Sequence, residues 1–470
     1  MTVAPGFTVS RTSLLAALLL AGLLTGCASL DTAPARESVR QTVAGKTGQA
    51  VPPRVSGPAA TEPVELPDAD AAARLALSRN PAMEALLAEL DMAEAAAVQA
   101  TLLRNPFLHA SVLYPRDGHG GKALDVGVSW DLPGLLSLGP RQQAADQARA
   151  AARFKAVAGL LELAARSRAA WYAHLADREG EAWWDDQVEA AALQAEIARR
   201  LEQAGNLPPL AAAGARAAHL EAESARGDAR RQARASLEQL AGLLGVGVPG
   251  QLRLPEQLPR LPVADPPAPD PAILEEADWV LAALRADLER ARQVSEVARQ
   301  TGWTDTLELG WAWGRESDGA WKDGPALGLS LPLFDTGAAR RAAARFETDR
   351  LAARIAERRL TLAREAREAV ERMQRARVRV ENLRENLLPL LSEAQDAALL
   401  QYNAMQKSPF HLLDLKQREI AAVRQLIQGL ADYWQARTAL EALGQGVSLG
   451  SAAEPRALAP ALPASSSGGH

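Results

Sequence analysis

Two kinds of hydrophobic pattern occur along the chain, and the first alternates at every residue. The stretch from Leu307 reads LELGWAWG, in which Leu and Trp alternate with Glu, Gly and Ala. Successive side chains of a strand point to opposite faces, so this stretch predicts a strand with one apolar face. Three further stretches alternate in the same way. The sequence therefore predicts four strands, at 107–114, 123–132, 306–314 and 325–333, the last with Leu327, Leu329, Leu331 and Leu333 on its apolar face.

The second pattern repeats every three or four residues. From Leu362 to Ala394, apolar residues recur in alternating steps of four and three, with Arg and Glu between them. This is the heptad seam of a coiled coil. It predicts a helix over 337–404, on the order of 65 residues and roughly 100 Å long, which Pro389 should bend or locally loosen. Further helices are predicted at 141–203, and as return segments at 208–244 and 409–443.

The same order of elements occurs twice, which suggests an internal duplication. The first repeat covers 68–249 and the second covers 272–446, and a proline-rich linker at 250–271 excludes a continuous helix between them. Residues 27–67 have no helical or strand period and are predicted to form a tether. Residues 447–470 are predicted to be a disordered tail.

The first 26 residues have the features of a signal peptide. Arg11 precedes an apolar run, Leu14 to Leu24, that is too short to span a bilayer but suits the core of a signal peptide. Thr25, Gly26 and Cys27 follow Leu24, and this short segment resembles a bacterial lipobox. Cys27 is the only cysteine of the chain. We therefore expect cleavage after residue 26, acylation of Cys27, and no internal disulfide.

Composition and charge exclude several classes of function. The chain has 470 residues, is 48% apolar but only 4% aromatic, and carries a net charge of −5. The sequence contains no concentrated basic face, so we do not expect nucleic acid as a partner. The six histidines are scattered, none in an HExxH spacing, and no phosphate loop or nucleophile elbow occurs. We expect no enzyme activity, no catalytic residues, no bound metal and no cofactor.

The four strands have the length of tilted transmembrane strands. An open sheet of four strands would leave its edges unpaired in lipid, so other copies must close it. Eight strands would nearly fill a barrel with their own side chains, whereas twelve or more leave a lumen. We expect Asp125 and Glu308 to face this lumen, and the lipid-facing side chains to be Leu307, Leu309, Trp311, Trp313 and Trp130.

Taken together, these features resemble the TolC family of outer membrane efflux proteins, in its OprM-type lipoprotein branch. The resemblance covers roughly residues 65–446 and rests on the lipobox, the duplicated strand pairs with LPLFDTG (331–337), the long helices, and the tips AGNLPP (204–209) and YNAMQKSPFHLLDLKQ (402–417). It implies a mainly α protein with a small membrane sheet. Three protomers would complete a twelve-stranded barrel in the outer membrane of a Gram-negative bacterium, with a helical barrel in the periplasm.

The resemblance also implies partners and site residues. The helical tips would meet a periplasmic adaptor that links the channel to an inner-membrane pump, and candidate contacts are Gly205, Pro208, Pro209, Ser408, Pro409 and Phe410. The prolines could equally be simple turn formers. Asp414 would form a ring of carboxylates at the periplasmic entrance, or be an ordinary coiled-coil surface residue. The family usually has Gly where this chain has Lys407 or Ser408, and His411 stands where relatives carry an acid.

An alternative is a lipid-anchored periplasmic coiled-coil scaffold without a pore. It would explain Cys27 and the long helices, but it leaves the apolar faces of the strands without a partner. The sequence does not indicate the transported substrate, because drugs, metal ions, solvents and peptides would all pass a wide lumen.

Overall fold

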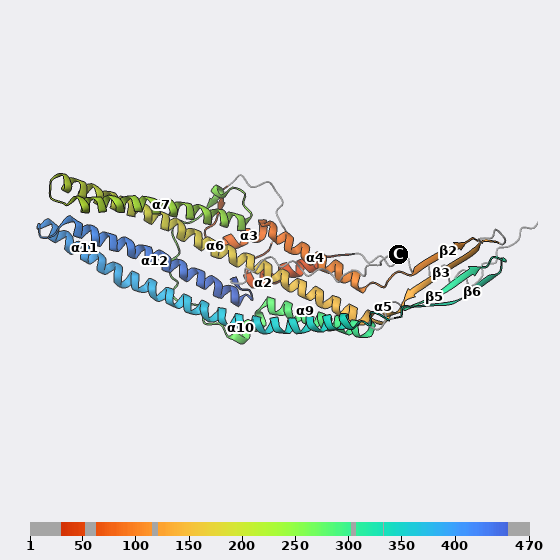
Figure 1. Cartoon of the computed structure of the whole chain (residues 1–470). Helices are drawn as coiled ribbons and strands as arrows, with labels where there is room; N and C mark the ends of the chain where they lie inside the picture. The colour runs from red at the N-terminus through yellow and green to blue at the C-terminus, as the bar shows by residue number, and fades with distance from the viewer. Residues whose placement is uncertain (1–29, 52–62, 115–120, 302–306, 332, 450–470) are drawn as a thin grey trace, which may run out of the picture.

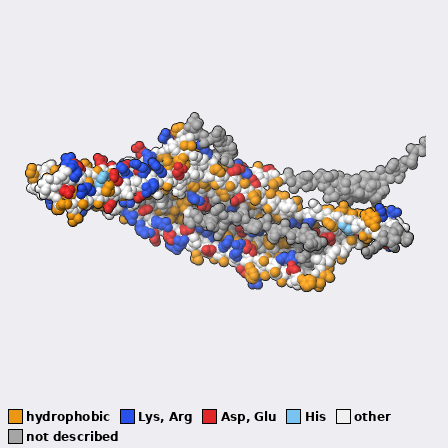
Figure 2. All heavy atoms as spheres, turned by 45° about the horizontal axis from the view of Figure 1, so that its top comes forward, with side chains coloured by type: hydrophobic (Ala, Val, Ile, Leu, Met, Phe, Trp, Pro, Cys, Tyr) orange, Lys and Arg blue, Asp and Glu red, His pale blue; other side chains and the backbone are white. Residues whose placement is uncertain are grey.

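The computed structural model describes residues 30–51, 63–114, 121–301, 307–331 and 333–449 of the chain. The molecule is elongated, with helical hairpin tips at one end and a four-stranded sheet at the other (Figure 1). The predicted signal peptide and Cys27 lie outside the described residues. Basic and acidic side chains are intermixed over the helical part of the face seen in Figure 2.

Long helices form the body of the molecule, because Ala, Leu, Arg and Glu are strong helix formers. In the first half, α6 runs from Leu138 to Gln203 without a break, and α7 (Pro209–Leu244) returns beside it. In the second half, α10 (Ala338–Asn382) and α11 (Leu388–Asn403) follow one line, and α12 returns between α10 and α6. The helix α12 spans Pro409–Gly444, and the shorter helices are α2 (Ala33–Thr47), α3 (Ala69–Arg79), α4 (Pro81–Thr101), α5 (Leu132–Leu136), α8 (Pro271–Ala277) and α9 (Trp279–Thr301).

A π-helical turn, η2 (Leu383–Leu387), separates α10 from α11. The backbone N–H of Leu388 donates to the carbonyl of Leu383, a step of five residues instead of four. Pro389 follows directly and has no N–H to donate. The expected loosening around Pro389 is therefore present as a turn of wider helix.

The large sheet has the order β2-β3-β5-β6, and all its neighbouring strands are antiparallel. Its strands are β2 (Phe107–Leu113), β3 (Ala123–Asp131), β5 (Leu307–Arg315) and β6 (Trp321–Leu329). A short parallel pair, β1 (Val64–Glu65) and β4 (Leu252–Arg253), ties the start of the first repeat to the linker, where the 3-10 turn η1 spans Pro249–Gln251.

The predicted fourth strand, 325–333, was placed about four residues too late along the chain. Leu329 pairs with Leu307, the first residue of β5, so β6 ends where its partner begins. Leu331 and Leu333 lie beyond the strand and are exposed, while Trp321 extends it at the other end. Strand pairing, which the alternation of one segment does not contain, sets these limits.

The predicted tether contains a helix, α2 (Ala33–Thr47), and is in this respect wrong. Its buried residues Ala35, Val39 and Val43 recur every four residues and pack in the main hydrophobic core. Arg36 binds Glu84 at 2.7 Å and also pairs with Asp91, both on α4. The small side chains of this segment gave too weak a period to indicate a helix.

The predicted tail also starts later than expected. Val447 and Ser448 are buried, and Val447 belongs to the main core. Residues 450–470 lie outside the described residues.

Two hydrophobic clusters stabilise the helical body. The larger joins α6, through Trp171 and Leu160, to α2, α3 and the linker residue Leu252. The smaller joins α9, α10 and α12 around Met373 and Tyr433. Asp265 of the linker contacts this second cluster, because Tyr433 donates a hydrogen bond to it at 2.6 Å and Arg377 at 2.8 Å.

Candidate functional site

One face of the large sheet is apolar and exposed. Val126, Val128 and Trp130 of β3 lie opposite Trp313, Trp311 and Leu309 of β5, so all six share one face. Trp130 is 52% exposed, Leu309 48% and Trp311 43%. Leu307 pairs with Leu329 on the same face. The five side chains predicted to face lipid are thus on one surface, and the sheet projects beyond the helices in Figure 1.

The opposite face carries small and charged side chains. Asp125 and Glu308, the two residues predicted to face the lumen, both belong to it. Glu308 accepts a hydrogen bond from the Ser129 hydroxyl at 2.7 Å, and the His109 ring lies 2.7 Å from the Asp125 carboxylate. The pairing of β2 with β3 puts His109 on this face and brings it to Asp125.

Glycines of this face lie opposite its larger side chains. A Cβ atom at Gly127 would overlap the ring of His109. A Cβ at Gly328 would come 3.5 Å from Glu308. The His109 ring therefore lies along the wall over Gly127, whereas Gly328 and Glu308 are ordinary neighbours across the strands.

The edges of the sheet are open. β2 and β6 each have one strand neighbour, and neither has a second partner among the described residues. Each outer edge presents backbone N–H and C=O groups to the surroundings. A further strand could pair at either side.

A concave surface runs between the two helical hairpins. It encloses a volume of about 860 Å³, lined from α6, α7, α10 and α12 by residues such as Arg166, Gln239, Arg372 and Asp432. The linker binds the other side of the same helices, where Trp434 donates to the carbonyl of Pro259 at 2.9 Å. One side of the helical layer thus contacts the linker, and the other is a groove lined by charged side chains and by alanines.

Asp414, the predicted gate residue, is on α12. It precedes the groove residue Asp432 by 18 residues, which is about five turns of helix, so both project in nearly the same direction. Its carboxylate lies 3.0 Å from Arg418 on the next turn, and its side chain is about half exposed. Helical spacing alone therefore relates Asp414 to the groove residue Asp432, and a cationic partner, Arg418, compensates its charge.

The two tips have the same local geometry. Gly205 and Met405 both adopt left-handed backbone, with φ of 72° and 58°. In each tip the next N–H donates back to a carbonyl five residues earlier, from Asn206 to Leu201 at 2.8 Å and from Gln406 to Gln401 at 2.9 Å. The second tip therefore needs its unusual backbone at Met405, and not at Lys407 or Ser408, where a glycine was expected.

The predicted adaptor-contact residues lie together at these tips. Pro208 precedes α7 and Pro209 is its first residue. Ser408 is exposed, Pro409 is the first residue of α12 and Phe410 follows it. The sequence did not single out Met405, whose side chain is 95% exposed at the second tip.

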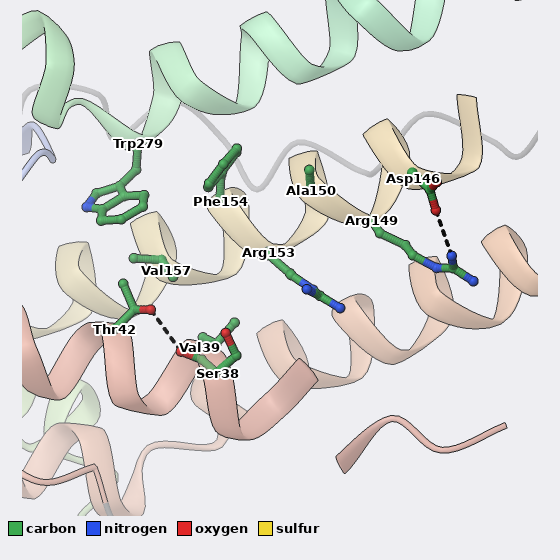
Figure 3. A pocket seen from close by; sticks show the side chains of 10 residues that line it. All are labelled: Ser38, Val39, Thr42, Asp146, Arg149, Ala150, Arg153, Phe154, Val157 and Trp279. Atoms are coloured by element: carbon green, nitrogen blue, oxygen red, sulfur yellow. Dashed lines mark hydrogen bonds and ion pairs between the residues drawn. The ribbon is translucent and has the colours of Figure 1, made fainter. Parts of the chain in front are cut away.

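A cavity of about 520 Å³ lies between α2, α6 and α9 (Figure 3). The rings of Phe154 and Trp279 are 6.0 Å apart at its apolar side. Arg149 pairs with Asp146 at 2.9 Å, and Arg153 pairs with Glu94 at the same distance. The charged groups of this cavity are held by each other.

Hydrogen bonds determine the protonation state of Asp265, the linker residue that contacts α10 and α12. Burial disfavours the ionised form of Asp265, but the hydrogen bonds from Arg377 and Tyr433 outweigh it and hold the pKa of this carboxyl below its ordinary value. Asp265 is therefore a carboxylate at neutral pH that joins α10 to α12.

The helices that the structure describes include none long and apolar enough to cross a membrane. Within the same part of the chain, no group of three or more His, Cys, Asp and Glu side chains could hold a metal ion.

Comparison with known proteins shows what the chain resembles. No protein-family model matches the chain. The cobalt-zinc-cadmium resistance protein CzcC of Cupriavidus metallidurans is 25% identical over 376 residues, 79% of this chain and 88% of that protein. The Campylobacter jejuni CmeC outer membrane channel has a TM-score of 0.67 and 16% identity, over 81% of this chain and 86% of its own. The open state of the Neisseria gonorrhoeae MtrE outer membrane channel has a TM-score of 0.61 and 17% identity, over 85% and 98%.

The chain has the fold of the TolC-like outer membrane channels and resembles CzcC in sequence. The predicted resemblance to this family is confirmed, and so is the mainly helical fold with a small sheet. The predicted class of function, outer membrane efflux, is confirmed at this level. The similar solved proteins are described as channels rather than enzymes.

Proposed function

We propose that three copies of this TolC-like chain form the exit duct of a tripartite efflux system, which passes small molecules or ions from the periplasm to the exterior. One observation carries the proposal. The large sheet has an exposed apolar face and two unpaired edges. In lipid each unpaired backbone group would cost several kcal/mol, so closure by sister strands is the arrangement that removes the cost.

The same arrangement gives a role to the helices. Three sheets of four strands make a twelve-stranded barrel, which is wide enough for a lumen. Below it, the bare groove between the hairpins would face the axis, and the linker would lie outside. A helix as long as α6, with 66 residues, reaches roughly 100 Å into the periplasm.

The anchor at Cys27 completes the membrane attachment in this proposal. Cys27 precedes α2 by six residues. Six residues of extended chain span about 20 Å at most. Because α2 packs on α4 and α6, acyl chains on Cys27 would enter the outer membrane close to the chain's own barrel.

The tips and Asp414 form the periplasmic end. We assign Gly205, Pro208, Pro209, Ser408, Pro409 and Phe410 to contact with a periplasmic adaptor, which would connect the duct to an inner-membrane pump. Asp414 would narrow the entrance, since it lies five residues after the start of α12, next to the tip, and a whole number of helical turns before the groove residue Asp432. In a planar bilayer, Asp414→Ala should raise the conductance and lower the preference for cations. Unchanged values would remove Asp414 from the gate.

Divalent metal cations are the substrate class best supported for this duct. CzcC, the relative found by sequence, is named for cobalt, zinc and cadmium resistance. The polar face of the sheet carries Asp125, Asp131 and Glu308, which would attract cations into the barrel.

The oligomeric state tests the proposal most directly. The acylated full chain, purified in detergent, should be a trimer by light scattering, should change its mobility on gels when heated, and should form ion-conducting pores in planar bilayers. The scaffold alternative leaves Trp130 and Trp311 exposed to water. A protein lacking Cys27 that is soluble, monomeric and without pores would support the scaffold and contradict the duct.

A further inference from the structure

The polar face of the sheet has an excess of acidic groups. Its described charged side chains are Asp125, Asp131, Glu308 and Lys322, three acids against one base. Lys322 is paired with Glu316 beside β6. Arg104 lies 3.4 Å from Asp131, near the start of β2. If this face is the barrel lumen, as the proposed function requires, cations are concentrated along it.

One position on this wall combines a nitrogen ligand with a carboxylate. His109 of β2 lies directly opposite Gly127, and Asp125 is two residues along β3. The ring extends over Gly127 until its Nε2 atom is 2.7 Å from Oδ1 of Asp125. Both side chains are about half exposed, so water and ions reach the pair from the lumen side.

We propose that His109 and Asp125 form a transit site for borderline divalent metal ions such as Zn²⁺, Co²⁺ and Cd²⁺. Imidazole nitrogen and carboxylate oxygen bind Zn²⁺ at about 2.0–2.2 Å. A tetrahedral ion held by both atoms would separate them by about 3.3 Å on that geometry. The pair would therefore open by only about half an ångström from its observed distance of 2.7 Å. The ion binds the lone pair on Nε2 of the neutral ring: the proton on Nε2 leaves to water and water returns one to Nδ1, so the imidazole stays neutral.

Gly127 makes this movement possible. A larger residue there would collide with the ring, which now lies against the bare backbone. Gly127 is thus a positioning residue, and it does not contact the ion.

The site would bind an ion weakly, and weak binding is what a duct requires. Only two protein atoms bind the ion, so water completes its coordination and dissociation stays fast. Conduction requires binding that attracts an ion and still releases it. The imidazole nitrogen favours Zn²⁺, Co²⁺ and Cd²⁺ over Mg²⁺, which binds oxygen ligands and retains its water shell. The site would therefore distinguish these ions from the common hard cations.

The experiment uses the acylated full chain in a planar bilayer with symmetric KCl. Added ZnCl₂ should reduce the potassium current, and MgCl₂ at equal concentration should reduce it less. In His109→Gln the zinc concentration for half-block should rise at least about fivefold, with the magnesium effect unchanged. Asp125→Asn should also raise the zinc concentration for half-block. His219→Gln on α7 is the matched control, since it removes a histidine outside the sheet, and it should leave the zinc block unchanged.

A second measurement is independent of conduction. Co²⁺ bound to a histidine shows a characteristic visible absorption, which the trimer in detergent should display with wild-type His109 and lose in His109→Gln. If pores conduct and both variants keep the wild-type zinc block, the metal site is refuted while the duct stands. If the protein forms no pores at all, the duct itself is refuted, and the lumenal site with it.

Discussion

The two long rods of the molecule occupy the same place in the two repeats, yet they differ in continuity. α6 continues for 66 residues, whereas its counterpart is split into α10 and α11 by a π-helical turn next to Pro389. α6 buries large side chains such as Trp171 in the main core, but α11 buries only Ala398 among its own residues. The first rod is therefore fixed by packing, and the tip half of the second is held mainly by its own helix and by α12.

The tips extend this contrast. Both tips turn through one left-handed residue, but the first uses Gly205 and the second uses Met405. A side chain in this conformation costs about 1–2 kcal/mol, a cost that glycine avoids. The second hairpin thus has a strained turn, a widened helix and little burial, which makes it the more easily deformed of the two. Four experiments, with six substitutions, test this difference.

The largest expected effect comes from the core of the first rod. Trp171 is 1% exposed, so Trp171→Ala should lower the free energy of unfolding by about 3–5 kcal/mol. Leu400→Ala in α11 is the matched change in the second rod, where the side chain is 71% exposed, and should alter stability by less than about 0.5 kcal/mol. Denaturant unfolding of the purified protein measures both. Equal losses would contradict the contrast in packing.

The next effect concerns Asp265, which holds α10 to α12. Asp265→Asn leaves Arg377 and Tyr433 poorly matched and should destabilise the protein by about 1–3 kcal/mol at pH 7. The pKa of Asp265 is below its ordinary value, so its contribution is present above the unfolded pKa of about 3.9 and is lost as the pH falls through the lower folded value. The difference between wild type and variant should therefore shrink in acid. A constant difference from pH 7 to pH 3 would argue against a role for the ionised carboxyl.

The two tip residues should respond in opposite directions. Gly205→Ala places a Cβ in left-handed backbone and should destabilise its hairpin by about 1 kcal/mol. Met405→Gly should relieve strain and be neutral or stabilising by up to about 1 kcal/mol. Hydrogen exchange of the tip amides measures both changes in stability. If both substitutions changed stability in the same direction, Gly205 and Met405 would not occupy equivalent positions in the two turns.

Pro389→Ala should have the smallest effect on global stability, because the π turn already accommodates the missing N–H. Alanine at position 389 supplies a backbone N–H donor, so hydrogen exchange between Leu383 and Leu390 should slow. The free energy of unfolding should rise by less than about 1 kcal/mol. Unaltered exchange there would mean that residues other than Pro389 cause the wide turn.

Much of the fold could be predicted because its signals are local. Heptad spacing indicated the long helices, and strict alternation indicated the strands and the face on which Asp125 and Trp311 lie. α2 was missed because Ala35, Val39 and Val43 give a weak period that only packing on α4 and α6 stabilises. The shift of the fourth strand follows from its pairing with β5, a contact that no single segment encodes.

The candidate site was harder to predict for the same reason. The pairing of His109 with Asp125 depends on the alignment of two strands, which decides which side chains become neighbours. The groove between the hairpins draws residues from four helices far apart in sequence. Met405 was not recognised as the left-handed residue because sequence patterns associate that backbone with glycine.

The glycines opposite His109 and Glu308 affect the free width of the proposed channel. Since the His109 ring occupies the space that Gly127 leaves empty, the free diameter of a closed barrel at this level would be set by backbone positions and hardly by side-chain length. A valine at Gly127 or Gly328 would then obstruct transport of bulky solutes although every charge was retained, whereas exchanging one polar group for another of similar size would alter which ions pass and leave the aperture as wide as before.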